Sequence, residues 1–135
     1  MSIDKNINEN NIGTLMSIYI TNNPLVVEKA FDYEISHVEA KGVAEVLTAV
    51  RDLVHKGHKL QSHPLSGSVK PSETPYKTVV LSKTAGELCL NSLRIIEDSI
   101  IMAEKMENNS KRRQYSQAAL KDFQLIDYGL IFGKP

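Results

Sequence analysis

Residues 55–77 bring together the side chains of this chain that are best suited to chemistry. The segment reads HKGHKLQSHPLSGSVKPSETPYK and holds three of the four histidines, three of the five prolines, several hydroxyl groups and four lysines against one glutamate. Each proline fixes its own φ and restricts the residue before it, which lowers the entropy cost of ordering a long loop. We therefore predict a preset loop that offers hydrogen-bond donors to an anion.

The middle of this loop carries a small polar cluster. Ser66, Gly67, Ser68 and Lys70 place two hydroxyls, a flexible glycine and an ammonium within five positions. Backbone N–H groups and a lysine in such a cluster can bind phosphate or carboxylate. The GxxxxGK[ST] spacing of a P-loop is absent, so the cluster does not indicate nucleotide hydrolysis. The alternative is a rigid surface loop whose hydroxyls bond their own backbone.

His63, directly before Pro64, is the candidate general acid or base, or an anion contact. Its structural alternative is a ring that packs on Pro64 and bonds a loop carbonyl.

His55 and His58 suggest a metal, but a transition-metal site usually needs three or four converging ligands. His55 falls in the last turn of a predicted helix, where the dipole favours a cation, and His58 follows a predicted glycine cap. We predict no metal and no cofactor.

Cys89 is the single cysteine. An internal disulfide is therefore excluded, which fits a reducing cytosol. The residue falls on the apolar stripe of a predicted helix, so we expect a buried structural thiol that reagents label slowly until denaturant is added.

Thr21, Asn22 and Asn23 form a second candidate segment, at the end of the apolar run 15–20. Asn23 is expected to cap a helix that starts with Pro24, while Thr21 and Asn22 are available to a ligand. Ligands of open α/β sheets bind outside the carboxyl ends of the strands. We therefore expect this turn and the 63–70 loop to lie side by side.

The elements that must position these residues follow from apolar spacing and turn residues. Strands are predicted at 15–20, 33–39, 59–62 and 77–82, with 33–39 at an edge. Helices are predicted after Pro24, over 43–54 with Gly57 as the C-terminal cap, from a capping box of Thr84 and Glu87, and over about 111–127, ended by Gly129. This order predicts an α/β fold, a small layered sandwich with a mainly parallel sheet of about four strands, flanking helices and two C-terminal helices. We expect a flexible arm at 1–13 and a single domain over 14–135.

The composition of the chain narrows the classes of partner that we expect it to bind. Sixteen Lys and Arg balance sixteen Asp and Glu, which argues against nucleic-acid binding. The basic run 111–113 is short enough to be an exposed surface. The N-terminus lacks the apolar run of a signal peptide or membrane span, so a cytoplasmic protein is expected. The apolar tail 128–133 is expected to pack on the core or to form a homodimer contact.

Three stretches of the chain, TNNP, VRDLVHKGHKLQSHPLSGSVKP and ETPYKTVVLS, closely resemble the GrdX family. The resemblance extends over about residues 15–105. Members of that family are encoded with the glycine, sarcosine and betaine reductase systems of anaerobic bacteria. The resemblance implies a cytoplasmic accessory role beside amino-acid fermentation, with reductase components as partners, and it supplies no catalytic residues.

Three hypotheses follow from the sequence. The first is an accessory protein that binds a small anionic ligand or a partner protein through residues 21–23 and 63–77. The second is an enzyme acting on a small phosphorylated or carboxylated compound, with His63 as acid or base. The third is a purely protein-binding module that assists reductase assembly.

Overall fold

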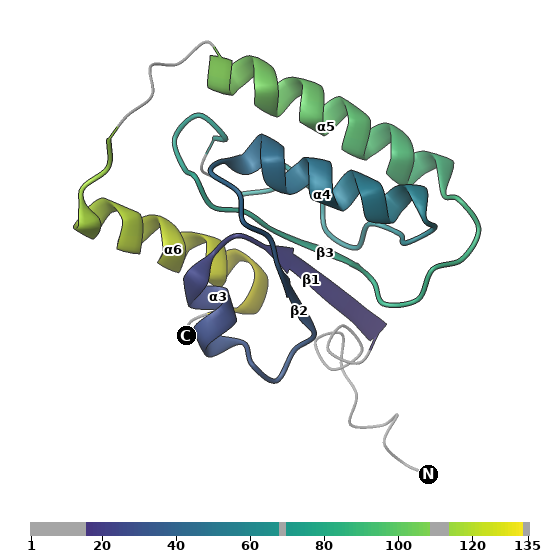
Figure 1. The fold of residues 1–135 in the computed structure, drawn as a ribbon, viewed down its shortest axis with the longest axis horizontal. Coiled ribbons are helices and arrows are strands. Elements are labelled where there is room, and N and C mark those ends of the chain that lie inside the picture. Colours follow the sequence, from purple (N-terminus) through teal and green to yellow (C-terminus); the bar gives the residue numbers. More distant parts are fainter. Residues whose placement is uncertain (1–15, 68–69, 109–113, 134–135) are drawn as a thin grey trace.

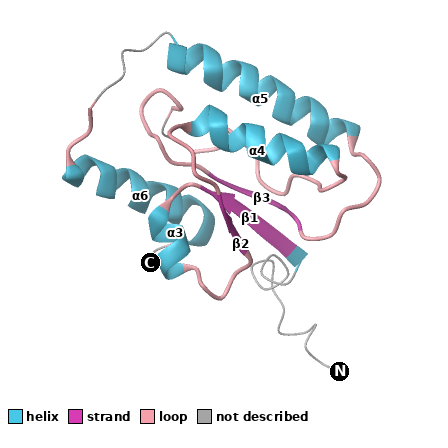
Figure 2. Cartoon of the chain, in the orientation of Figure 1, coloured by secondary structure: helices cyan, strands magenta, loops and turns pink. Residues whose placement is uncertain are grey.

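The structure is a computed structural model that describes residues 16–67, 70–108 and 114–133 (Figure 1). In chain order its elements are β1 (Ser17–Thr21), α3 (Pro24–Lys29), β2 (Ile35–His37), α4 (Val43–His55), β3 (Thr78–Ser82), α5 (Leu90–Asn108) and α6 (Gln117–Phe132). Helices α4 and α5 lie on one side of the strands, and α3 and α6 lie on the other (Figure 2). None of the described helices has the length and apolar character needed to cross a membrane.

The sheet has three strands in the order β2-β1-β3. β1 pairs in parallel with β2 and antiparallel with β3, so that Thr21 lies opposite Thr78. The predicted α/β class is confirmed, but the predicted mainly parallel sheet of about four strands is wrong. The chain re-enters the sheet at the end where β1 finishes, which makes β3 antiparallel.

The predicted strand 59–62 contributes one isolated bridge, between Leu60 and Leu81. The backbone N–H groups of Gln61 and Ser62 both donate to the carbonyl of Val80. Two successive residues therefore share one acceptor, which breaks the alternating bond pattern that a strand needs.

β1 is central because its sequence, SIYIT, can be buried almost throughout. β2 is a short edge strand of half-buried and exposed residues, as predicted. The turn between β1 and α3 also follows expectation. The side chain of Asn23 accepts a hydrogen bond from the N–H of Leu25, and Pro24 occupies the first helical turn.

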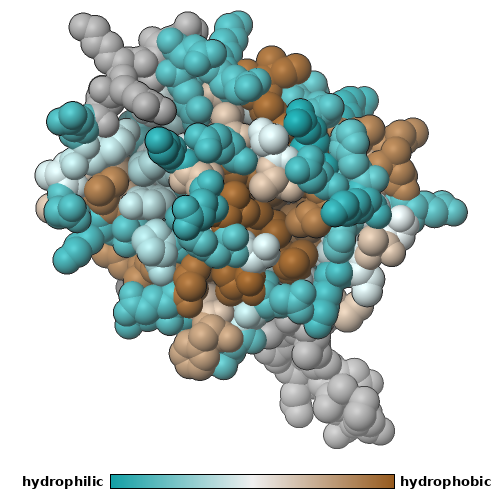
Figure 3. Space-filling model, viewed as in Figure 1, coloured by the Kyte–Doolittle hydropathy of each residue, from teal (hydrophilic) through white to brown (hydrophobic). Residues whose placement is uncertain are grey.

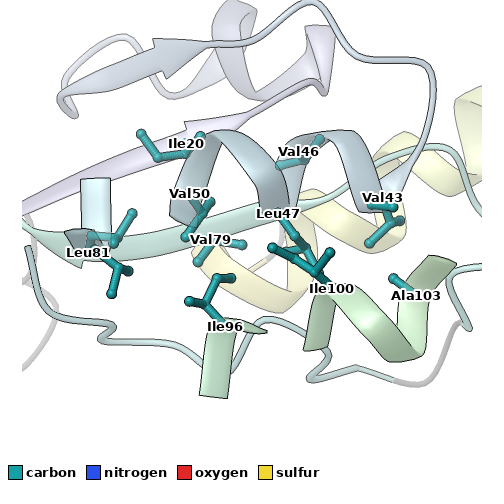
Figure 4. Packing of buried hydrophobic residues seen from close by; sticks show 12 residues of the cluster. Ile20, Val43, Val46, Leu47, Val50, Val79, Leu81, Ile96, Ile100 and Ala103 are labelled. Atoms are coloured by element: carbon teal, nitrogen blue, oxygen red, sulfur yellow. The ribbon is translucent and has the colours of Figure 1, made fainter. Parts of the chain in front are cut away.

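The main core lies between α4, α5 and one face of the sheet (Figure 4). Val46, Leu47 and Val50 of α4 are fully buried, at the spacing that predicts an amphipathic helix. They pack with apolar residues of the sheet and of α5: Ile20, Val79, Leu81, Ile96, Ile100 and Ala103.

Gly57 follows the end of α4 with φ of 104°, which confirms the predicted C-terminal cap. A Cβ at this position would lie 2.0 Å from the carbonyl oxygen of Gly86. The N–H of Gly86 donates to the carbonyl of Gly57 at 3.0 Å. The two glycines therefore hold residues 84–86 against the end of α4.

This contact explains why α5 begins at Leu90 and not at Thr84, where it was predicted. The capping box of Thr84 and Glu87 does not form, because both residues lie before the helix. The last helix also differs from its prediction. It starts at Gln117, with Ser116 as the cap, and continues through Gly129 to Phe132. The predicted arm 1–13 and the basic run 111–113 lie outside the described residues.

A second, aromatic cluster covers the face of the sheet opposite α4. The ring of Phe132 lies 5.1 Å from that of Tyr19, 4.8 Å from that of Tyr33 and 5.0 Å from that of Tyr128. Val26 of α3 and Ala30, which follows this helix as its C-terminal cap, complete it. The apolar tail therefore packs on the core of its own chain, which is one of the two arrangements expected from the sequence.

Candidate functional site

The carboxyl end of β1 enters a buried polar network. The Thr21 hydroxyl lies 2.8 Å from that of Thr78, and it accepts the N–H of Asn23 at 3.0 Å. Thr21 and Asn23 are fully buried. These partners give both residues a structural role, because each buried polar group needs a hydrogen bond.

Asn22 joins two loops. Its Nδ2 donates to the carbonyls of Ala40, at 3.1 Å, and Pro75, at 2.7 Å, while its Oδ1 accepts the N–H of Lys77 at 2.9 Å. Both amide protons and the carbonyl oxygen are therefore engaged. The side chain ties the loop after β2 to the segment before β3.

Asp127 of α6 lies at the centre of the same network. Its Oδ1 accepts the N–H of Thr78 at 3.0 Å, and its Oδ2 accepts the Thr78 hydroxyl at 2.7 Å and Nδ2 of Asn23 at 3.0 Å. Burial raises the pKa of the Asp127 carboxyl, against the hydrogen bonds from Thr78 and Asn23 and the charge of Lys77. The sequence interpretation missed this residue, although an aspartate between Ile126 and Tyr128 in an apolar tail was a visible signal.

Lys77 connects the two predicted segments. The residue is buried; its backbone N–H donates to Oδ1 of Asn22, and its Nζ donates to the carbonyl of Ser66 at 2.7 Å. Burial lowers the pKa of the Lys77 ammonium, and the nearby charge of Asp127 partly opposes that shift. The 21–23 turn and the 63–67 part of the loop therefore lie at one edge of the sheet, joined through Lys77.

The predicted ligand contacts of the loop lie at its surface. His63 is exposed and its Nδ1 accepts the N–H of Leu65 at 3.1 Å, while the Ser66 hydroxyl donates to the carbonyl of His63 at 2.9 Å. Gly67 and Lys70 are also exposed, and Ser68 lies outside the described residues. Ser66 thus bonds its own backbone, in agreement with the structural alternative for the cluster.

His58 has a structural partner, since its Nδ1 lies 2.8 Å from the carbonyl oxygen of Ser82. In the part of the chain that the structure describes, no three His, Cys, Asp or Glu side chains are grouped to hold a metal ion.

A groove of about 500 Å³ opens beside this network, and we call it the carboxyl-edge groove. It lies between the start of α4, residues 71–76, the end of α5 and the start of α6. The side chains that bear on its chemistry are Asn22, Lys41, Glu45, Tyr76, Glu107 and Tyr115. Predicted segments 21–23 and 63–77 therefore supply part of the lining, but Lys41, Glu45, Glu107 and Tyr115 were not predicted.

Several hydrogen bonds fix the walls of the carboxyl-edge groove. Oε1 of Glu107 accepts the N–H of Ala44 at 3.1 Å, and a Cβ at Gly42 would lie 3.1 Å from that oxygen. The Tyr115 hydroxyl donates to the carbonyl of Glu73 at 2.8 Å, and the Tyr76 hydroxyl accepts from Gln124 at 2.9 Å. Both tyrosine rings are thereby held in place.

A second cavity of about 20 Å³ lies between the loop and α6, beside Lys77 and Asp127. It has room for about one water molecule, so it cannot hold a metabolite. The carboxyl-edge groove is the better candidate for a site.

The predicted buried position of Cys89 within a helix is wrong. The residue is half-buried and directly precedes α5, and its carbonyl accepts the N–H of Leu93. Hydrogen bonds from the Ser92 side chain, and from the backbone of Ser92 and Asn91, lower the pKa of the Cys89 thiol. It lies about 27 Å from Glu107 along α5, at 1.5 Å per residue, and so outside the groove.

Residues 18–134 match the family model described as GrdX-like protein. The match includes every element that lines the carboxyl-edge groove. No curated protein and no solved structure matches the chain.

Proposed function

The chain belongs to the GrdX-like family, and on that premise we propose that it is an accessory protein of glycine, sarcosine or betaine reductase-type amino-acid fermentation. In this role it binds a small ligand that carries a carboxylate in the carboxyl-edge groove. Residues 21–23 hold the groove together, and the 63–77 segment supplies one of its walls.

The observation that carries this proposal is the groove itself. Its volume of about 500 Å³ falls within the range of roughly 300–1,000 Å³ that is usual for small-molecule sites. It lies at the carboxyl ends of β1 and β2, where open α/β sheets bind ligands. The bonds of Asn22, Glu107 and Tyr115 support a pocket that is formed before the ligand arrives.

Lysines support the carboxylate preference. Lys41 lines the groove and Lys70 directly precedes Pro71, another lining residue. Both side chains are exposed, so an arriving carboxylate can reach them. A hydrogen bond to a charged group contributes about 1.5–3 kcal/mol.

Binding is favoured over catalysis by the position of His63. This residue was the candidate acid or base, but it is not among the residues that line the groove, and its Nδ1 is bonded to Leu65. His63, the predicted acid or base, therefore lies outside the proposed ligand site.

A protein partner is the second candidate. Apolar residues gather over the sheet between α4 and α3 on the face in Figure 3, close to the short edge strand β2. Phe31, just after α3, is 77% exposed. A reductase component could pack on this surface, and Phe31→Asp should then abolish its binding to the purified chain.

The ligand proposal is tested by calorimetry with phosphate, small carboxylates and amino acids. Lys41→Ala and Lys70→Ala should each weaken carboxylate binding about tenfold or more, since 1.4 kcal/mol is a factor of ten. Their thermal stabilities should stay near that of the wild type, because exposed substitutions usually change the free energy of unfolding by less than about 0.5 kcal/mol. Lys56→Ala, at the opposite end of α4, is the control. If no compound binds the wild-type protein, the ligand proposal fails and the partner-binding role takes its place.

A further inference from the structure

The carboxyl-edge groove has an unusual charge distribution for a carboxylate site. Its charged lining residues are one lysine, Lys41, and two glutamates, Glu45 and Glu107. A ligand that is only anionic would meet the carboxylate of Glu45 as well as the ammonium of Lys41. The groove therefore favours a ligand with a positive group as well as a carboxylate.

Lys41 and Glu45 are both left without an ion-pair partner in the described part of the chain. The ion pairs found there join Arg51 to Glu97 and Lys83 to Glu34. Lys41 and Glu45 line one groove with opposite charges, yet they do not pair with each other. A ligand with two opposite charges can bind both.

Lys41 does not stabilise α4, the helix that it precedes. It precedes α4, and a cation near a helix N-terminus is opposed by the helix dipole. Glu45 in the first turn does favour the helix. Lys41 therefore presents to the groove an exposed cation that the helix does not require.

Two tyrosine rings complete the arrangement. Tyr76 and Tyr115 are half-buried in the lining, and their hydroxyls are held by Gln124 and by the carbonyl of Glu73. An ammonium group is attracted to an aromatic face within about 6 Å of its centre. Fixed rings beside carboxylates are a setting that suits ammonium and quaternary ammonium groups.

We infer that the carboxyl-edge groove binds a small zwitterion, with its carboxylate toward Lys41 and its ammonium toward Glu45 and the rings of Tyr76 and Tyr115. This inference rests on the proposed function and specifies its ligand class. The ligand is a short carbon skeleton that carries both charges, such as an amino acid or an N-methylated amino acid.

The test compares two molecules of the same shape. Trimethylglycine and 3,3-dimethylbutyrate differ by a quaternary nitrogen in place of a quaternary carbon, so only the first carries a positive charge. Glycine and propionate form a second pair for a primary ammonium. Calorimetry on the full chain should give at least tenfold tighter binding to the zwitterion of at least one pair.

Two variants assign the charges to residues. Glu45→Gln should reduce the preference for the zwitterion to less than threefold, while Lys41→Met should weaken both members of a pair and leave their ratio unchanged. Both positions are exposed, and thermal melting confirms that each variant is folded. Glu28→Gln, on the exposed surface of α3, is the matched control.

The outcomes separate this inference from the proposed function. Equal binding of both members of each pair would overturn the inference and leave the carboxylate site intact. An unchanged preference in Glu45→Gln would also overturn it. If neither member of either pair binds, the inference fails, and the wider panel of carboxylates and amino acids then decides whether the proposed function fails with it.

Discussion

At the scale of single residues, Cys89 shows how a small shift of a helix boundary changes chemistry. The spacing of Cys89, Leu93, Ile96 and Ile100 suggests one continuous apolar stripe. The backbone contact between Gly57 and Gly86 delays the start of α5, however, so the thiol lies before the helix and not within its buried face. No local pattern reveals that contact, because its two glycines are far apart in sequence.

We predict that Cys89 reacts with thiol reagents in the native protein. Hydrogen bonds from Ser92 and Asn91 lower its pKa, so the reactive thiolate forms at lower pH than in an ordinary cysteine. The rate of iodoacetamide labelling, measured against pH, should rise with a midpoint below 9.0, the ordinary value. Ser92→Ala should move that midpoint upward. Labelling that stays slow until denaturant is added would restore the buried-thiol interpretation.

Asn22 was identified from the sequence as a ligand contact, but its hydrogen bonds give it a supporting role. We predict that Asn22→Ala lowers the free energy of unfolding by about 2–4 kcal/mol, because three backbone partners lose their bonds. Urea unfolding measures this loss. Asn91→Ala, at an exposed position, should change stability by less than about 0.5 kcal/mol. A small effect at Asn22 would mean that the side chain is free to bind a ligand directly.

At the scale of elements, the predictions succeeded where the signal is local. The dense apolar spacing of α4 and the Asn23-Pro24 start of α3 lie within a few residues of sequence. The direction of β3 is set by the pairing of Thr21 with Thr78 across 57 positions. The failure of 59–62 to form a strand likewise depends on which carbonyls of β3 it meets. The strand propensity of a single segment does not reveal which distant residues it will pair with.

The turn that ends α4 gives a matched test at this scale. We predict that Gly57→Ala destabilises the protein by roughly 3 kcal/mol, since it combines a positive φ with a Cβ 2.0 Å from the carbonyl of Gly86. Gly86→Ala, whose Cβ would meet no atom within 4 Å, should be close to neutral. Thermal and urea unfolding of both variants measure the difference. Equal stabilities would show that the segment 84–86 moves away from α4 at little cost.

At the scale of the whole molecule, the sheet separates two apolar clusters and its carboxyl edge carries the polar network. The sequence predicted this edge in part, because residues 21–23 and part of the 63–77 segment do meet there, although the strand 59–62 from which that loop was expected to leave does not form. It missed Lys41, Glu45, Glu107 and Asp127, since these lie on helix ends and a helix face that meet only in the folded chain. The candidate site is therefore a product of tertiary packing more than of a motif.

Burial of Lys77 and Asp127 near this edge makes stability depend on pH in opposite ways. The pKa of Asp127 is raised, so its favourable contribution is complete below the unfolded value near 3.8 and is lost as pH rises through the folded value. The pKa of Lys77 is lowered. Its favourable contribution is therefore complete above the unfolded value near 10.5 and is lost as pH falls through the folded value.

The alkaline side can be tested by comparing the wild type with a variant that lacks the Lys77 ammonium. We predict that the free energy of unfolding of the wild type rises relative to that of Lys77→Met as the pH increases from 7 toward 10.5, because the unfolded chain binds the Lys77 proton more tightly. Urea unfolding at several pH values measures this difference, in which the titration of groups that do not interact with Lys77 cancels. Lys121→Met, at an exposed position on α6, is the matched control. A difference that stays flat or falls with pH would contradict this prediction. It would mean that Asp127 and the Ser66 carbonyl offset the cost of burying the charged Lys77 side chain, so that Lys77 holds the loop without a loss of stability.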